Sequence, residues 1–343
     1  MTVNIGVIGV GMIGQDHIRR LTQVLSGATV TAVTDVDLDR AKTVADALPN
    51  AKVCDSGQAL IDDDAVDAVV VASWGGTHEE YVLAAIAAGK QVFCEKPLAT
   101  TRQACENILE AEQKTGKRLV MVGFMRRYDD AYRAMKAALD AGEVGAPLVY
   151  YSGHRNPSVL SGTTDGVLVD TCVHDIDVSR YLFDSEVTGV QVFSPRRSSH
   201  ANEGLQDPVL VHLELANEML VVIEAAVNVD YGYDIRGEVL GETGTIELAE
   251  SSTIVVKRSG QHSGRVPADW RERFIRAYDV EFQEWIDAVA AGHSTGPSSW
   301  DGYAAAVVTD ACVEAFRSGA KSDVSLPERP ALYAPGNGRV GTD

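Results

Sequence analysis

The sequence predicts an α/β protein of two domains, a Rossmann-type doubly wound parallel sheet followed by an α+β domain with a mostly antiparallel, open sheet. Up to about residue 123, short apolar runs alternate with longer segments of helical period. Beyond that point, strands of alternating polarity are joined by short turns. The length of 343 residues also fits two domains, at about 100–200 residues each. We place the domains at 1–123 and 124–343.

The first domain contains five predicted strands and four predicted helices. The strands are Val3–Ile8, Ala28–Thr34, Asp67–Ala72, Gln91–Cys94 and Arg118–Val122. The helices are Met12–Leu25, Leu38–Leu48, Thr77–Ala88 and Thr101–Lys114. Because the strands are short and almost wholly apolar, we expect them to be buried on both faces, as in a parallel sheet covered by helices.

The second domain begins with predicted helices at 129–141 and 170–183 on either side of a strand at 147–153. Two hairpins follow, Val209–Leu215 with Met219–Val229 and Gly237–Gly241 with Thr245–Leu248. Further helices are expected at about 270–291 and 300–318. The alternate apolar residues of this sheet predict a face that associates with other copies of the chain.

Composition excludes several classes of partner. Thirty basic and 49 acidic residues give a formal charge of −19, which repels nucleic acid and anionic membrane surfaces. Five cysteines without a CxxC pair or a nearby histidine cluster predict neither a disulfide framework nor a metal site. The N-terminus lacks a signal peptide pattern and no apolar run is long enough to span a membrane, so we expect a cytoplasmic protein.

A glycine motif predicts the cofactor site. Gly9, Gly11 and Gly14 directly follow the first strand and open the first helix, with Met12 and Ile13 between the last two glycines. Such a turn lets backbone N–H groups approach a pyrophosphate at the helix N-terminus. Asp35 ends the second strand, 21 residues beyond Gly14, where a carboxylate can accept hydrogen bonds from the adenosine ribose and disfavour a 2′-phosphate. This predicts NAD rather than NADP, although Asp35 could instead be a turn or capping residue.

Two segments carry candidate catalytic groups. Lys96 ends the fourth predicted strand, within Glu95-Lys96-Pro97, at the sheet edge where ligands bind. Its ammonium could stabilise a developing alkoxide, and we expect both Glu95 and Lys96 to contact the cofactor; the alternative is a solvated surface lysine. In the second segment, Asp170, His174 and Asp177 fall on one face if the stretch is α-helical. A histidine near a carboxylate can act as a general base, although an exposed acidic helix with an incidental histidine has the same pattern.

Five segments together resemble the Gfo/Idh/MocA oxidoreductases, and the resemblance extends from Ile5 to at least Cys312. They are Gly9–Gly14, Cys94–Leu98, Gly123–Asp129, Asp170–Asp177 and Tyr231–Ile235. The resemblance implies a catalytic triad of Lys96, Asp170 and His174, with His174 as general base. It also implies that Ser73, Trp74 and His78 approach the cofactor and that a polyol is bound by Arg126, His154, Asn156, Thr171, Asp177 and Tyr233.

The segments containing Arg126 and Tyr233 indicate inositol as the substrate within that family. The resemblance therefore implies NAD-dependent oxidation of myo-inositol to 2-keto-myo-inositol (scyllo-inosose) by a homotetramer. A scyllo- or D-chiro-inositol dehydrogenase, or an aldose pyranose dehydrogenase, remains an alternative, because the segment 156–166 is of a kind that varies between relatives. A non-catalytic regulator on the same fold has no need of Lys96, Asp170 and His174 together, which disfavours that reading.

Overall fold

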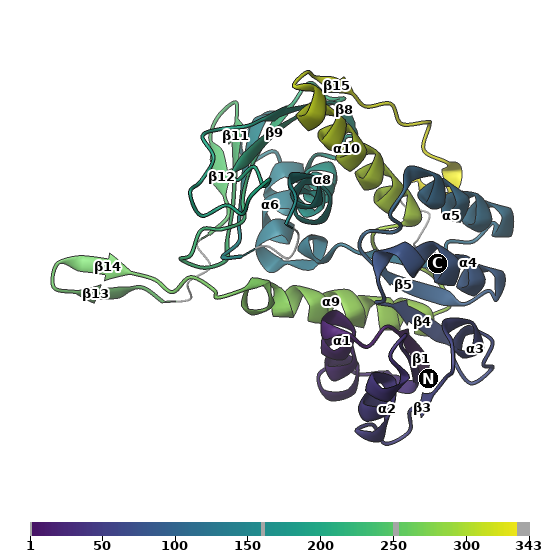
Figure 1. The fold of residues 1–343 in the computed structure, drawn as a ribbon. Coiled ribbons are helices and arrows are strands. Elements are labelled where there is room, and N and C mark those ends of the chain that lie inside the picture. Colours follow the sequence, from purple (N-terminus) through teal and green to yellow (C-terminus); the bar gives the residue numbers. More distant parts are fainter. Residues whose placement is uncertain (1, 159–161, 250–253, 335–343) are drawn as a thin grey trace. The chain divides into compact units, whose positions relative to one another are not determined.

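The computed structural model describes residues 2–158, 162–249 and 254–334 (Figure 1). The chain divides into two compact units. The first unit comprises Met1–Phe124, Tyr278–Ala306 and the stretch from Pro327 onward; the second comprises Met125–Ala277 and Val307–Leu326. The first division thus lies one residue from the predicted seam, and two later segments are counted with the first unit.

A parallel sheet of six strands forms the centre of the first unit, in the order β3-β2-β1-β4-β5-β6. The strands are β1 (Val3–Ile8), β2 (Ala28–Thr34), β3 (Lys52–Val53), β4 (Ala68–Val71), β5 (Gln91–Glu95) and β6 (Val120–Gly123). This order confirms the predicted doubly wound sheet. Among the described strands of this sheet, β3 alone was not predicted, because its two residues are too few to show a pattern.

The helices of this sheet begin at identifiable caps. They are α1 (Met12–Gln23), α2 (Leu38–Asp46), α3 (Gly57–Ile61), α4 (His78–Ala87) and α5 (Arg102–Thr115). Asp37, Ser56 and Thr101 each accept a hydrogen bond from a backbone N–H of the first turn of α2, α3 and α5. By contrast, Gly11 caps α1 without a side-chain hydrogen bond.

The second unit contains a mostly antiparallel sheet of seven strands, in the order β12-β11-β7-β10-β9-β8-β15. The strands are β7 (Pro147–Arg155), β8 (Val187–Phe193), β9 (Val209–Leu215), β10 (Leu220–Ala226), β11 (Asp234–Gly241), β12 (Thr245–Glu247) and β15 (Ser322–Asp323). Both predicted hairpins are present, as β9 with β10 and β11 with β12. Among the described strands of this sheet, only β7 and β10 pair in parallel, which confirms the predicted sheet class.

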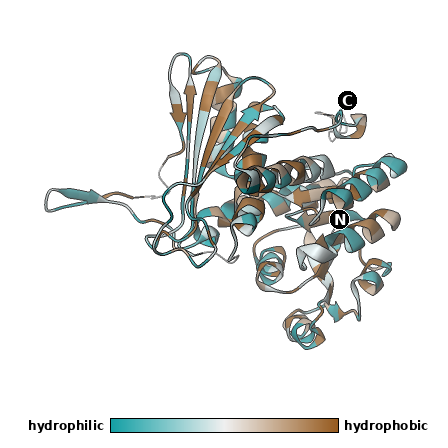
Figure 2. Cartoon of the chain, turned by 45° about the horizontal axis from the view of Figure 1, so that its top comes forward, coloured by the Kyte–Doolittle hydropathy of each residue, from teal (hydrophilic) through white to brown (hydrophobic). Residues whose placement is uncertain are grey.

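Alternate residues of this sheet distinguish its two faces. Tyr150, Val221 and Val211 are fully buried, and α8 (Cys172–Phe183) contacts β7 and β10, with α6 (Asp130–Asp140) packed against α8. On the opposite face, Tyr151 and Leu240 are 50% and 40% exposed. Figure 2 shows hydrophobic stretches along these strands, and the second face therefore presents uncovered apolar surface.

The remaining elements are one small hairpin, two long helices and several short turns of helix. The hairpin pairs β13 (Val256–Arg258) with β14 (Gln261–Ser263). The long helices α9 (Trp270–Ala290) and α10 (Ser299–Ser318) each continue from one unit into the other. The short turns are η1 (Gly75–Thr77), η2 (Met125–Tyr128), α7 (Thr164–Gly166), η3 (Val167–Thr171) and η4 (Ala331–Tyr333).

The five cysteines, all of which lie in the described part of the chain, are buried and form no disulfide. Burial raises the pKa of the Cys94 and Cys172 thiols well above the usual value, and it raises the pKa of Cys312 to about 12.

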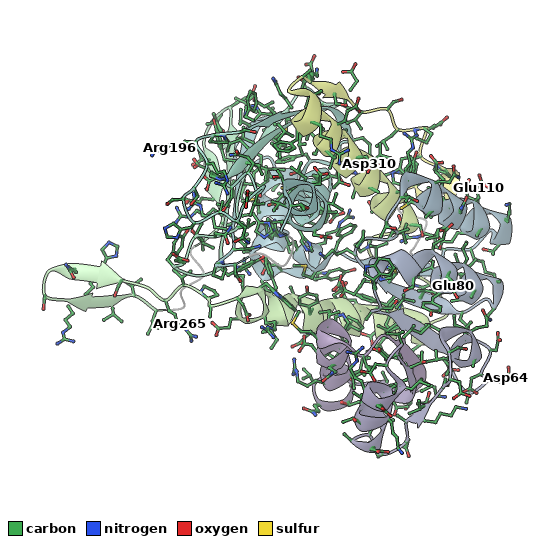
Figure 3. The ribbon with its side chains drawn as sticks, in the orientation of Figure 1. Asp64, Glu80, Glu110, Arg196, Arg265 and Asp310 are labelled. Carbon is green, nitrogen blue, oxygen red and sulfur yellow. The ribbon has the colours of Figure 1, made fainter. Side chains whose placement is uncertain are left out.

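Charged side chains such as Asp64, Glu80 and Asp310 point away from the ribbon (Figure 3). No helix in the described part of the chain is long and apolar enough to cross a membrane.

Candidate active site

The glycine turn between β1 and α1 is shaped by close backbone contacts. Gly9 has φ +92°, and a Cβ there would lie 2.5 Å from the Ser73 nitrogen. A Cβ at Gly14 would lie 2.0 Å from the Gly9 carbonyl oxygen, whereas one at Gly11 would meet nothing within 4 Å. The turn therefore requires glycine at 9 and 14 and leaves open space at the N-terminus of α1, which suits a dinucleotide pyrophosphate.

Asp35 follows β2 and is tied to the glycine turn. Its Oδ2 accepts a hydrogen bond from the Val10 N–H at 2.7 Å, and its Oδ1 accepts one from the Arg40 guanidinium at 2.6 Å. Burial alone would raise the pKa of Asp35, but the hydrogen bonds from Arg40 and the backbone lower it. Asp35 is thus held as a carboxylate. No arginine directly follows Asp35 in the sequence, so the contact with Arg40, five residues further on, was not predicted.

The loop after β4 combines an anchored histidine with an exposed tryptophan. His78 is buried, with Nδ1 at 2.7 Å from the Pro97 carbonyl oxygen and Nε2 at 3.0 Å from that of Ser73. Trp74 is 79% exposed, which is unusual for a large aromatic side chain. Met12, in the first turn of α1, is also more than half exposed. These side chains leave apolar surface available to a ligand.

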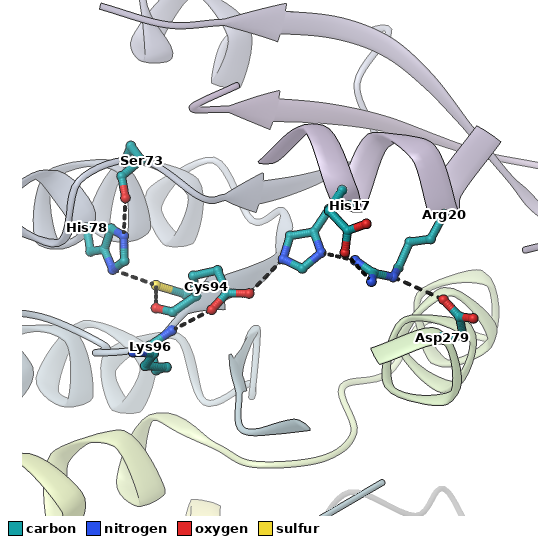
Figure 4. Close-up of polar contacts among 9 residues, drawn as sticks. His17, Arg20, Ser73, His78, Cys94, Lys96 and Asp279 are labelled. Atoms are coloured by element: carbon teal, nitrogen blue, oxygen red, sulfur yellow. Dashed lines mark hydrogen bonds and ion pairs between the residues drawn. The ribbon is translucent and has the colours of Figure 1, made fainter. Parts of the chain in front are cut away.

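Glu95 and Lys96 lie at the carboxyl end of β5 and in the residue that follows it. The Glu95 side chain is buried, and its Oε1 lies 2.6 Å from His17 Nε2 (Figure 4). Lys96 is half-buried. The position at the edge of the parallel sheet agrees with the prediction, while the contact between Glu95 and α1 was not foreseen.

A buried carboxylate organises the candidate residues of the second unit. Asp175 Oδ1 lies 2.6 Å from Arg126 Nη1, and its Oδ2 lies 2.7 Å from His154 Nδ1. The Ser152 hydroxyl donates a further hydrogen bond at 2.7 Å. Burial alone would raise the pKa of Asp175, but Arg126 and His154 hold it well below the usual range. Asp175 was missed because its run of acidic residues hides which carboxylate is buried.

The cluster brings together three of the predicted polyol-binding residues. Arg126 and His154 both contact Asp175, and the Tyr233 hydroxyl lies 3.4 Å from His154 Nε2. Arg126 Nε and Asn156 Oδ1 are buried without a hydrogen-bond partner among the described residues. A free donor and a free acceptor fit a ligand that carries hydroxyl groups.

The segment around His174 differs in part from the predicted single helical face. Asp170 is exposed and belongs to the π-helical turn Val167–Thr171, which precedes α8. Thr171 and His174 are nearly buried, at 8% and 9% exposed. Because a π-turn is wider than an α-turn, the α-helical spacing used in the sequence analysis does not apply to Asp170.

Asp177 is oriented by an arginine that the sequence analysis did not select. It is buried and forms a two-pronged ion pair with Arg127, at 2.9 Å and 2.5 Å. Residues 159–161 of the variable segment lie outside the described residues. In the described part of the chain, no group of three His, Cys, Asp or Glu side chains could hold a metal ion.

The fold and these residues are typical of oxidoreductases that use a nicotinamide dinucleotide. The NAD-binding Rossmann domain of the GFO/IDH/MocA oxidoreductase family matches residues 3–124, and the C-terminal alpha/beta domain of that family matches residues 136–326. The chain belongs to this family, and its cofactor is NAD.

Two bacterial proteins and one solved structure illustrate the similarity. The inositol 2-dehydrogenase of Serratia proteamaculans is 53% identical, over 97% of this chain and 99% of its own. That of Azotobacter vinelandii is 52% identical, over 98% of this chain and 100% of its own. The crystal structure of the Lactobacillus casei myo-inositol dehydrogenase with NAD(H) and myo-inositol has a TM-score of 0.95 and 40% identity, covering 97% and 100% of the two chains.

The Asp35–Arg40 pair generates a prediction about cofactor choice. Asp35→Ser should raise the KM for NAD and improve the use of NADP, because it removes a carboxylate and leaves Arg40 free to attract a 2′-phosphate. Steady-state kinetics with both cofactors measure the change. Adding Arg40→Ala to Asp35→Ser should remove much of the gain with NADP. An unchanged cofactor ratio in Asp35→Ser would show that Asp35 only supports the turn.

The buried carboxylate at Asp175 generates a prediction about stability. Asp175→Asn should destabilise the protein by about 3–5 kcal/mol, because it leaves the buried Arg126 charge uncompensated. The stabilisation is present above the unfolded-state pKa near 3.8 and is lost as the pH falls below it. Thermal unfolding should therefore separate wild type and variant most at neutral pH. Asp140→Asn, at an exposed ion pair with Lys136, should cost less than about 1 kcal/mol.

Proposed function

We propose that the protein is an NAD-dependent inositol 2-dehydrogenase that oxidises the axial hydroxyl of myo-inositol to a ketone, giving 2-keto-myo-inositol. The observation that carries the proposal is the full-length match to the Lactobacillus casei myo-inositol dehydrogenase, whose structure is a complex with NAD(H) and myo-inositol. The inositol 2-dehydrogenases that are about half identical to this chain support it. The clustered donors and acceptors around Asp175 agree with a polyol substrate.

The proposed chemistry assigns one task to each catalytic side chain. NAD, when bound, accepts the hydride from the alcohol carbon. His174 accepts the hydroxyl proton as general base, and Asp170 stabilises the resulting imidazolium. Lys96 donates a hydrogen bond to the same oxygen and stabilises its developing negative charge. A cofactor-binding regulator that performs no catalysis has no need of Lys96, Asp170 and His174 together, which disfavours that alternative.

The proposed cofactor and substrate contacts follow the residue types. The backbone around Gly9, Gly11, Met12, Ile13 and Gly14 would hold the pyrophosphate and Asp35 the ribose, with Ser73, Trp74, His78, Glu95 and Lys96 toward the other end of the dinucleotide. Arg126, His154, Asn156, Thr171, Asp177 and Tyr233 would hydrogen-bond the inositol hydroxyls. A site that binds each hydroxyl rejects analogues that lack one.

We further propose a cytoplasmic homotetramer. The uncovered face of the seven-stranded sheet supports association, because Tyr151, Phe193 and Leu240 are each at least 39% exposed there. Light scattering at micromolar concentration should give the mass of four chains. Tyr151→Glu should shift the mass toward smaller species, and Val36→Glu, at a fully exposed side chain of the first unit, should not. A wild-type monomer would contradict the proposal.

A substrate screen tests the proposed reaction. The absorbance of NADH is followed with myo-, scyllo- and D-chiro-inositol and with aldose pyranoses, using NAD and NADP in parallel. We expect the highest kcat/KM for myo-inositol with NAD. A clear preference for another isomer or for an aldose would support the alternative substrates, and no turnover with any of them would contradict the assignment.

The general base has its own prediction. His174→Ala should lower kcat by about 10²–10⁴, as the loss of a general base does. NAD binding, measured by fluorescence titration, should stay close to that of wild type. His200→Ala, at an exposed histidine of the same unit, serves as the matched control and should keep full turnover. Near-normal turnover of His174→Ala would eliminate the proposed role.

A further inference from the structure

A chain of hydrogen bonds within the first unit connects α1 to the end of β5 (Figure 4). Arg20 Nη1 lies 2.5 Å from His17 Nδ1, and His17 Nε2 lies 2.6 Å from Glu95 Oε1. The other carboxylate oxygen of Glu95 accepts a hydrogen bond from the Lys96 backbone N–H at 3.2 Å. The side chains of Arg20, His17 and Glu95 are all buried. The proposed mechanism uses neither His17 nor Arg20.

The partners of His17 determine where its ring proton lies. A guanidinium can only donate hydrogen bonds, so His17 Nδ1 must accept from Arg20. In a neutral imidazole the proton then lies on Nε2, which donates it to Glu95. Burial lowers the pKa of His17 from 6.5. Arg20 therefore selects the one neutral tautomer that can hold the Glu95 carboxylate.

The Glu95 carboxylate is ionised and fixed in place. Burial alone would raise its pKa, but the hydrogen bond with His17 and attraction to His17 and Lys96 lower it below 4.5. On the neighbouring strand, a Cβ at Gly123 would lie 3.3 Å from Glu95 Oε2. The titratable groups that act on this carboxylate are His17 from α1, Lys96 after the strand end, His78 from α4 and the buried thiol of Cys94 on β5 itself.

Arg20 is itself restrained on two sides. Its Nη2 donates to Asp16 at 2.6 Å and its Nε donates to Asp279 of α9 at 3.1 Å. The His17 ring packs against Phe282 at a centroid distance of 4.4 Å. Because helix, arginine and aromatic ring are all fixed, movement of the Glu95 carboxylate would break several buried contacts.

We propose that His17 is a positioning residue that, with its tautomer set by Arg20, holds Glu95 and through the Lys96 backbone the placement of the catalytic lysine. The inference rests on the proposed function, in which Lys96 acts on the substrate oxygen. The inference adds the requirement that α1 carry a neutral histidine in the helical turn that follows Gly14.

Two substitutions of similar size separate positioning from packing. His17→Gln can still accept from Arg20 and donate to Glu95, because its amide nitrogen is placed like His17 Nε2. His17→Asn reaches only the position of Nδ1 and leaves Glu95 without its donor. We expect His17→Asn to lower kcat by about 10- to 100-fold, as small displacements of catalytic groups do, and His17→Gln to keep kcat within about threefold of wild type.

The pH profile of kcat gives a readout that a loss of packing would not move. Without its donor, Glu95 should become protonated at higher pH, so the acidic limb for His17→Asn should move toward neutrality, while that for His17→Gln should not. Equal losses in both variants with an unmoved limb would overturn the proposal. A raised KM for NAD at unchanged kcat would also overturn it, since Glu95 would then serve cofactor binding alone.

A measurement on the wild-type protein keeps the inference testable without turnover or a stable Asn variant. Nitrogen-15 NMR of ring-labelled histidines, with His17 assigned from its absence in His17→Gln, should show the neutral Nε2–H tautomer at and below pH 6.5. The other tautomer, or an imidazolium at neutral pH, would overturn the inference even if inositol is oxidised. The expected tautomer without turnover on any polyol would instead contradict the proposed function alone.

Discussion

The close approach of α1 to the end of β1 is the constraint on which the first unit depends. A side chain at Gly14 would collide with the Gly9 carbonyl oxygen, so the helix can start at this depth only with glycine there. The same approach brings the open N-terminus of α1 beside Asp35 and, one to two turns later, sets His17 against Glu95. One steric requirement thus fixes the dinucleotide turn and the carboxyl end of β5, directly before Lys96.

Both units contain buried carboxylates, and each stabilises them with different residues. Burial of a carboxylate is favourable only where hydrogen bonds and opposite charges replace water. In the first unit a neutral histidine donates to Glu95, whereas in the second Arg126 contacts Asp175 directly. The acidity of the chain as a whole therefore coexists with inner carboxylates whose protonation is set locally.

The fold was largely predictable from sequence, because its strands and helices have strong periodicity. The bounds of β1, β2 and β9 agree residue for residue with the prediction, since alternation and burial determine them locally. The strand β3 and the helix α3 were missed because they are too short for a period to show. Nothing in the pattern indicates that the segment beginning at Tyr278 belongs with the first unit, because that depends on packing between distant parts of the chain.

The sequence analysis proposed residues for the site but not the contacts between them. The family resemblance implied Arg126, His154 and Asp177 as substrate-binding residues. Their contacts Asp175 and Arg127 were not selected, and neither was Arg40 beside Asp35. Adjacent charged residues look alike in a sequence, and only the fold shows which of them turns inward. The π-helical turn at Asp170 was likewise invisible, because a single wider turn leaves no periodic signal.

The reactivity of the buried thiols can report how often the structure around each of them opens. Cys94 lies in the first unit and Cys172 and Cys312 in the second, each fully buried with a raised pKa. Thiol reagents attack the thiolate, so the rate at which each cysteine is alkylated follows how often its own strand or helix becomes exposed. Mass spectrometry of the alkylated chain can thus compare the stabilities of the two units without any assay of catalysis.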